Sequence, residues 1–240
     1  SRSNPSNIGP IVNGFGAGGV SSTGINPRVD PVTGQPVGSR QSEYNVNGEI
    51  RAYGDSANLT LTKGFGDLTL TSISSALKGQ FLNTVDVDGT NVAALQINFA
   101  NHSKEYSQDL RLSSDFSGPF DFTAGLYYFK DIADIDTDYF IAGQSVTLAQ
   151  SYRQTRTSYA AYVDATFEFG PSSTLYGGLR YTSDHGRLKR FEVVPTITLQ
   201  PTIEYNDAKP SGRIGLRHKF TSDIMAYAQY SRGYRSSGFN

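Results

Sequence analysis

The strongest candidate for covalent catalysis in this 240-residue chain is the local run Ser183-Asp184-His185. A serine hydrolase needs a hydroxyl, an imidazole and a carboxylate that meet in space, each orienting the next. Neighbouring residues of a β-strand point to opposite faces, and this run lies in a segment with strand character. The other two histidines, His102 and His218, are distant in sequence and show no metal-ligating spacing. We therefore predict no catalytic residues and no enzymatic activity.

Groups that bind metal ions are equally sparse. The chain has no cysteine, which excludes a thiolate zinc site. The acidic run 134–138, Asp-Ile-Asp-Thr-Asp, offers oxygen atoms to Ca²⁺ but lacks the glycine and the closing glutamate of an EF-hand loop. We interpret it as a solvated acidic loop, and we expect no metal and no cofactor.

The composition excludes two broad classes of function. The formal net charge of −1 gives no electrostatic attraction for nucleic acid. No stretch approaches the roughly 18 uninterrupted apolar residues of a membrane-spanning helix. A membrane location would therefore require strands.

The chain divides into a loop and a series of strands. Residues 1–44 are dominated by Gly, Ser, Asn and Pro, and we interpret them as one long loop because they cannot bury enough surface to offset their ordering entropy. From residue 45 onward, runs rich in Thr, Tyr, Phe, Val, Ile and Leu are bounded by turn residues. We predict strands at about 47–63, 67–79, 104–115, 120–130, 152–169, 174–189, 209–220 and 224–236.

Short and long connections alternate between these strands. Tight turns are predicted at 64–66, 117–119, 170–173 and 221–223, and long connections at about 80–103, 131–151 and 190–208. In an up-and-down barrel every second connection lies at the same end. The alternation therefore places all short turns on one side, as in outer-membrane barrels with periplasmic turns and extracellular loops. We predict an all-β fold, an antiparallel up-and-down transmembrane β-barrel.

Side-chain alternation agrees with a lipid-facing and a polar side. In 158–169 the odd-numbered residues from Tyr159 to Phe169 are apolar or small, whereas the even-numbered set includes Asp164 and Glu168. Two charged exceptions, Lys130 and His218, are expected near strand ends. Half of the phenylalanines lie close to a tight turn, which indicates an interfacial aromatic girdle. The two faces of 224–236 are nearly equal in polarity, so its lipid-facing side stays open.

The closing segment 225–240 reads Met-Ala-Tyr-Ala-Gln-Tyr-Ser-Arg-Gly-Tyr-Arg-Ser-Ser-Gly-Phe-Asn. It resembles a barrel motif of TonB-dependent receptors, Tyr-Ala-x-Tyr-Ser-(Lys/Arg)-Gly-(Tyr/Phe)-(Lys/Arg)-x-Gly-Gly-Phe-Asn, with Ser237 where the first glycine of the pair is usual. Segments 66–73, 106–114, 178–182 and 212–216 are similar to other strands of that family and follow the family's order.

The resemblance implies a fold and a function. A TonB-dependent receptor has a barrel of about 22 strands, filled by an N-terminal plug on which inner-membrane TonB pulls. The chain would supply about eight strands of such a larger barrel, with 45–240 as a partial barrel domain. We recognise no plug and no TonB box, and therefore expect an internal fragment. The implied function is energy-coupled uptake of a scarce nutrient, by default a ferric siderophore, in the bacterial cell outer membrane.

The implied partners are outer-membrane lipid, the TonB complex through a plug domain, and a small-molecule ligand such as a siderophore. The inferred inward face of the strands carries the candidate ligand-binding residues: Arg111, Arg156, Tyr162, Tyr176, Arg180, Arg213 and Arg217. These arginines either pair with carboxylates of a plug or of neighbouring strands, or attract an anionic ligand.

Two other interpretations stay open at this point. One is a small complete eight-stranded outer-membrane porin or structural barrel. The other is a soluble β-sandwich binding module or hydrolase, because alternation alone also fits a sheet whose apolar face points into a core.

Overall fold

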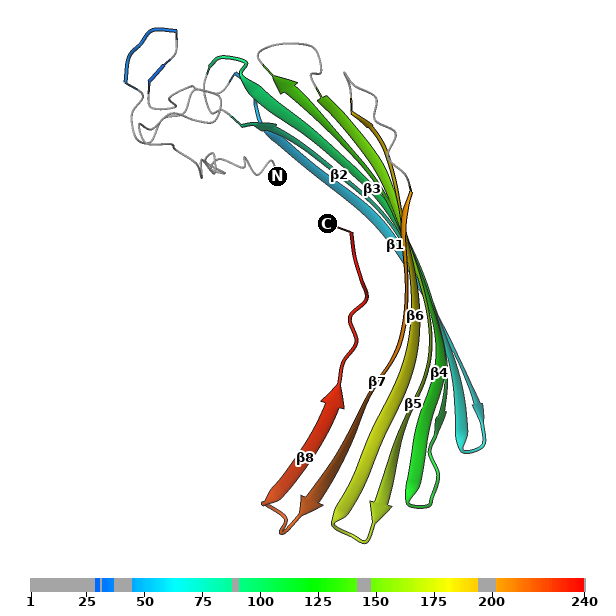
Figure 1. The fold of residues 1–240 in the computed structure, drawn as a ribbon. Coiled ribbons are helices and arrows are strands. Elements are labelled where there is room, and N and C mark those ends of the chain that lie inside the picture. The colour runs from blue at the N-terminus through cyan, green and yellow to red at the C-terminus, as the bar shows by residue number, and fades with distance from the viewer. Residues whose placement is uncertain are drawn as a thin grey trace.

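The computed structural model describes residues 29–30, 32–36, 45–87, 91–141, 148–193 and 202–239. These residues form one antiparallel sheet in which each of eight strands pairs with the next in chain order (Figure 1). The strands are β1 (Glu49–Phe65), β2 (Leu68–Asp86), β3 (Leu95–Ser114), β4 (Phe120–Ile141), β5 (Leu148–Phe169), β6 (Ser173–Val193), β7 (Ile203–Lys219) and β8 (Met225–Arg232). The predicted all-β, up-and-down architecture is confirmed.

The sheet is open, with β1 and β8 at its two edges. A complete eight-stranded barrel would need β1 to pair with β8, so that alternative is wrong. The part of the chain that the structure describes contains no helix long and apolar enough to cross a membrane.

All four hairpin turns lie at one end of the sheet (Figure 1). Gly66 and Gly170 adopt φ angles of 63° and 69° in two of these turns, a conformation that side chains with a Cβ disfavour. From β2 to β6 the strand ends shift by about one residue per strand, which corresponds to a strand tilt of about 35°.

The predicted long connections were wrong in extent. Residues 80–86, 95–103, 131–141, 148–151 and 190–193 belong to strands and pair with their neighbours. The acidic run 134–138 is therefore part of β4 and not a loop. In 80–86 and 131–141 polar residues lie on both faces, which hides the alternation by which a half-buried strand is recognised.

The convex face of the sheet is apolar toward the turn end. Cross-strand partners share a face, so the register aligns Leu126 with Ala161 and Tyr181, and Val163 with Leu179. Leu126 and Leu179 are 60% and 59% exposed, and no second layer covers this face in the described residues. The soluble β-sandwich alternative is therefore wrong, because its apolar face would be packed against another sheet.

Two aromatic bands border this apolar surface. Phenylalanines such as Phe120 and Phe167 lie at the turn end, and Tyr106, Tyr128, Tyr159 and Tyr181 lie farther along the strands. The Tyr128 and Tyr159 rings are 5.2 Å apart between centroids. Tyr128 follows Phe120 by eight residues, or about 26 Å along the strand. After tilt this is about 21 Å, which places the tyrosine rings inside the far border of the roughly 25 Å apolar band of outer-membrane barrels.

The register assigns the faces of β8. Its pairing with β7 places Ala226, Ala228 and Tyr230 on the convex face, in line with Leu216 and Ile214. Arg232, the last residue of β8, ends on the same face beside the open edge. Met225, Tyr227 and Gln229 lie on the concave face.

One of the two charged exceptions was misplaced. His218 lies near the end of β7, as expected, but Lys130 lies well inside β4. Lys130 is on the convex face, opposite Thr157 and Tyr106. Its position beyond the tyrosine band, rather than a strand end, separates it from hydrocarbon.

Residues 29–30 and 32–36 include a bridge between Val29 and Pro36. The Val32 amide donates to the Asp30 carboxylate at 2.8 Å, and the Asn91 side chain donates to it at 3.0 Å. The hydrogen bond from the Thr33 hydroxyl, together with that from Val32, lowers the pKa of Asp30 to about 2. The remainder of the predicted 1–44 loop lies outside the described residues.

Candidate ligand-binding site on the concave face

All seven candidate residues lie on the concave face of the sheet. The register aligns Arg111 with Gly125, Tyr162 and Arg180 in one row across β3 to β6. A second row joins Tyr176 to Gly215, and Arg156 lies farther from the turns, opposite Asp131. Their shared orientation follows from the two-residue period of a strand. Their role in ligand binding stays a prediction.

Two of the arginines stand over successive aromatic rings of β4. The Arg180 guanidinium carbon lies 5.1 Å from the centre of the Tyr127 ring, and that of Arg156 lies 5.1 Å from the Phe129 ring. Arg180 is also 5.7 Å from the Tyr162 ring, and its Nε donates to the Thr182 hydroxyl at 3.1 Å. These contacts hold both cations against the wall by cation–π attraction.

The two arginines line a hollow of about 430 Å³, here called the arginine hollow. Its wall consists of Tyr127, Phe129, Arg156, Ser158, Arg180, Thr182, Asp184, Tyr234 and Ser236. Neither guanidinium is in an ion pair with any residue of the described ranges. The hollow therefore combines aromatic faces, hydroxyl groups and the Asp184 carboxylate with two arginines that form no ion pair within these ranges, while Asp131 lies opposite Arg156 in the register. The guanidinium groups and the rings suit an anionic ligand with planar rings.

Two of the remaining candidate arginines have carboxylate partners in the sheet itself. Arg111 forms an ion pair with Asp109, which also accepts a hydrogen bond from the Tyr162 hydroxyl at 2.8 Å. Arg213 bonds Asp164 at 3.0 Å. The two pairs agree with the interpretation that inward arginines neutralise carboxylates of neighbouring residues.

Arg217 and Tyr176 lie closer to the turn end than the arginine hollow. Arg217 donates to the Thr174 hydroxyl at 3.0 Å. The Tyr176 ring lies 5.9 Å from the guanidinium carbon of Arg213 and covers Gly215, where an added Cβ would overlap the ring. Among the candidates, Arg156, Arg180 and Arg217 therefore form no ion pair in the described residues, and Arg156 and Arg180 are the two of them that line the arginine hollow.

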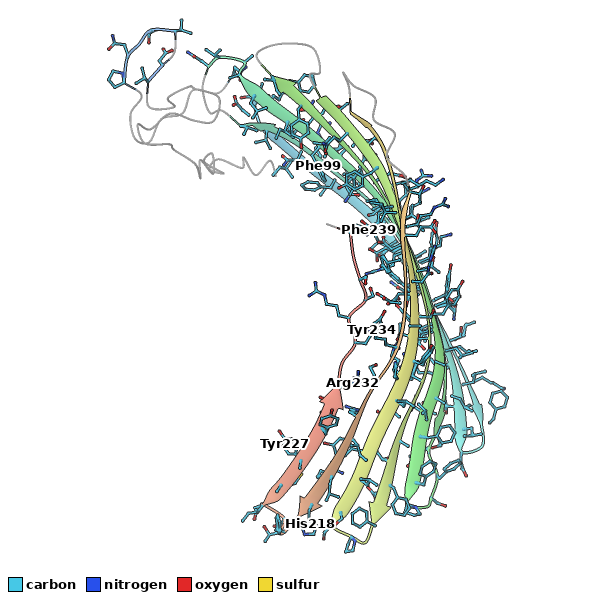
Figure 2. All side chains as sticks on the ribbon, in the orientation of Figure 1. Phe99, His218, Tyr227, Arg232, Tyr234 and Phe239 are labelled. Carbon is cyan, nitrogen blue, oxygen red and sulfur yellow. The ribbon has the colours of Figure 1, made fainter. Side chains whose placement is uncertain are left out.

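The segment after β8 crosses the concave face, as Figure 2 shows at Tyr234 and Phe239. The Tyr234 hydroxyl donates to Asp184 at 2.9 Å, and the Ser237 amide donates to Asp207 at 2.6 Å. The ring of Phe239 lies 5.2 Å from that of Tyr205. Asp184 and Asp207 are direct cross-strand partners, so these donors offset the repulsion of two like charges. Burial raises the pKa of Tyr234, and the hydrogen bond to Asp184 acts in the same direction.

Seven of the nine residues that line the arginine hollow were not among the sequence candidates, and three of these seven are aromatic: Tyr127, Phe129 and Tyr234. Tyr127 and Phe129 follow the same two-residue period as Asp121 and Thr123, so alternation alone identifies their face. Tyr234 was placed inside a strand predicted at 224–236, whereas β8 ends at Arg232. Nothing in the local sequence pattern signals that the chain leaves the sheet there.

The run Ser183-Asp184-His185 is split between the two faces. Asp184 points to the concave side, where Tyr234 binds it, and His185 on the convex side is 2.7 Å from the Asn206 side-chain oxygen through its Nδ1. A strand cannot bring the three side chains to one point. Within the described ranges, no three His, Cys, Asp or Glu side chains gather around a possible metal position.

An open, up-and-down sheet with an apolar convex face, aromatic borders and a polar concave face is a wall of an outer-membrane β-barrel. The family model described as TonB dependent receptor-like, β-barrel, matches residues 2–240. The chain belongs to this family, which places it in the bacterial outer membrane. The family is one of transport receptors.

Three solved structures share the fold. The ferric yersiniabactin uptake receptor FyuA from Yersinia pestis has 21% identity and a TM-score of 0.72 over 80% of this chain and 29% of that receptor. The siderophore receptor PiuA from Acinetobacter baumannii has 16% identity and a TM-score of 0.58, covering 76% and 32%. The ferric-catecholate import receptor Fiu from E. coli K12 has 12% identity and a TM-score of 0.55, covering 76% and 35%. The chain thus spans about a third of the length of these receptors.

Proposed function

We propose that the receptor to which this chain belongs imports a ferric siderophore, and that the arginine hollow contributes to ligand binding. The proposal draws on family membership and on the functions of the three similar receptors, which are a ferric yersiniabactin uptake receptor, a siderophore receptor and a ferric-catecholate import receptor. Transport would depend on the TonB complex acting through a plug domain. The chain would act in transport and not as an enzyme.

One observation carries the ligand-binding part of the proposal: Arg156 and Arg180 face the lumen without an ion-pair partner in the described residues. Guanidinium groups form strong, paired hydrogen bonds to anionic oxygens, so two arginines without an ion pair on one wall are suited to bind an anion. In contrast, Arg111 and Arg213 already have carboxylate partners.

Ferric siderophore chemistry suits this arrangement. A ferric complex with catecholate or phenolate ligands carries negative charge on oxygen atoms attached to aromatic rings. Guanidinium groups donate paired hydrogen bonds to such oxygens, and their planes stack on aromatic rings. Tyr127, Phe129 and Tyr162 surround the same two cations.

The test uses the full-length receptor with Arg156→Gln and Arg180→Gln, singly and together. The matched control is Arg51→Gln, which removes an exposed arginine from the convex side of β1, where it pairs with Glu49. Binding of a ferric catecholate is measured by intrinsic fluorescence quenching and uptake by ⁵⁵Fe accumulation. Each hollow variant should weaken binding by about 10-fold to 100-fold, the usual worth of a hydrogen bond to a charged group.

The ligand class is tested with two further probes, a ferric hydroxamate and a neutral maltooligosaccharide. Binding of the oligosaccharide, with no binding of either ferric complex, would reject the siderophore proposal. Unchanged ferric binding in the Arg156→Gln/Arg180→Gln double variant would reject the assigned role of the hollow while leaving the transport proposal intact.

A further inference from the structure

Three lysines project from the convex face at the same distance from the hairpin turns. Lys78 is the tenth residue after Leu68, the first of β2, and Lys130 is the tenth after Phe120, the first of β4. Lys104 is the tenth before Ser114, the last of β3. Because the turns share one end of the sheet, the three ammonium groups lie at one level, here called the lysine row.

The lysine row lies just beyond the apolar band. Ten residues correspond to about 33 Å along a strand, or about 27 Å normal to the membrane after tilt. Tyr106 and Tyr128, two residues nearer the turns on β3 and β4, belong to the tyrosine band. The level of the row is therefore that of the lipid headgroups on the side away from the turns.

Carboxylates of the described sheet lie beside the row but form no ion pair with it, so they offset its charge only in part. Lys78 and Lys104 are direct cross-strand partners, an arrangement that repels. None of the three lysines is in an ion pair with a carboxylate of the described ranges. Asp134, the nearest acidic residue above Lys104, is bound by Arg153 through two hydrogen bonds of 2.5 and 3.0 Å. Asp55 faces Lys78 from the other side, at the sheet edge, without an ion pair.

We propose that the lysine row binds the phosphate groups of a phosphorylated lipid headgroup in the outer leaflet of the outer membrane. Phosphate oxygens accept hydrogen bonds from ammonium groups, and one phosphate between Lys78 and Lys104 converts their repulsion into two attractions. The acyl chains of the same lipid would lie on Leu110 and Leu126, which are 39% and 60% exposed just below the tyrosine band. The row thus continues the lipid-facing surface into the headgroup layer.

The charge sign and the location select this occupant over others. A protein partner would need carboxylates at the membrane boundary, whereas phosphorylated headgroups are present there around the whole barrel. Lysine stems also lie along apolar surface while their ammonium groups reach the polar layer, which favours a position at this boundary. The proposal is independent of the arginine hollow, which lies on the opposite face.

The test uses native mass spectrometry of the full-length receptor in detergent, with bisphosphorylated lipid A as the probe. A Lys78→Gln/Lys104→Gln/Lys130→Gln variant removes the row, and Lys209→Gln/Lys219→Gln removes two lysines from the concave side of β7 as the matched control. Each lysine beside an anionic membrane surface strengthens binding by roughly fivefold, so the triple variant should bind about 100-fold more weakly. The control should bind like wild type.

Three arms separate the sources of binding. Lipid A without phosphates should bind wild type and the triple variant equally, and inorganic phosphate should not displace lipid A at equal concentration. Arginine in place of the three lysines should restore lipid A binding. Heat-modifiable gel migration checks that each variant is folded. Unchanged lipid A binding in a folded triple variant, or displacement by inorganic phosphate alone, would overturn the proposal.

Discussion

Arg213 on β7 reaches across β6 to Asp164 on β5, with 3.0 Å between the guanidinium Nη2 and the carboxylate Oδ2. The residue between them in the register is Gly178. A Cβ atom on Gly178 would overlap the Asp164 carboxylate. The ion pair therefore depends on a glycine in a strand that belongs to neither partner.

This relationship predicts the effect of Gly178→Ala. The new methyl group should displace Asp164 and abolish the energetic coupling between Asp164 and Arg213. Because both side chains are partly exposed, the coupling in wild type should be at most about 1 kcal/mol. A double-mutant cycle with Asp164→Asn and Arg213→Gln, read by urea unfolding of the full receptor in micelles, measures it. An equal coupling energy in the wild-type and Gly178→Ala backgrounds would contradict the prediction.

A second glycine supports Tyr162 in the row that contains Arg111 and Arg180. The Tyr162 ring covers Gly125, and a Cβ at Gly125 would overlap that ring. Gly125→Ala should therefore push the ring off the wall, break its hydrogen bond to Asp109 and destabilise the receptor by about 1–3 kcal/mol.

The matched control is Gly64→Ala on β1, where nothing lies within 4 Å of an added Cβ. Unfolding in urea should separate the two variants. Adding Tyr162→Ala to Gly125→Ala should recover part of the lost stability, since the overlap disappears with the ring. A Gly125→Ala variant as stable as Gly64→Ala would show that the ring relaxes without cost.

The sequence predicted the membrane part of the fold better than the part above it. Near the turns, one face of each strand meets hydrocarbon, so alternation marks residues such as Leu126 and Val163 clearly. Beyond the lysine row both faces meet water, and a strand such as 131–141 resembles a loop in composition. It is held in the sheet by backbone hydrogen bonds to β3 and β5, and these bonds do not depend on the type of side chain.

The candidate site was predicted as a face and not as a set of contacts. Alternation places Arg111, Arg156 and Arg180 on the same side of the sheet. An arginine can form an ion pair with a carboxylate two strands away, as Arg213 does with Asp164. Such pairs depend on the register between strands, which a single sequence does not reveal. The return of Tyr234 across β6 likewise depends on a long-range contact with Asp184.

The depth of the apolar band predicts a graded cost of positive charge on the convex face of β4. Leu126→Arg places a guanidinium within the band, where it should cost about 2–4 kcal/mol. Ile132→Arg lies on the same face beyond the lysine row and should cost about 0–1 kcal/mol. Folding of both full-length variants into phospholipid vesicles, measured by urea titration, checks the difference. Similar costs at the two positions would place the membrane boundary elsewhere.

Tyr234 predicts an alkaline transition on the concave face. Burial and the hydrogen bond to Asp184 raise the pKa of Tyr234, so its phenol should stay protonated where an ordinary tyrosine, with a pKa of about 10, ionises. A raised pKa means that this contact stabilises the fold fully below about pH 10 and is lost as the pH rises toward the higher pKa of the folded state. The difference in 295 nm absorbance between wild type and Tyr234→Phe should therefore show no ionisation near pH 10. Asp184→Asn removes the charge of the acceptor and should move the ionisation of Tyr234 to lower pH. An ordinary titration of Tyr234 near pH 10 in wild type would show that segment 233–239 does not pack against β6.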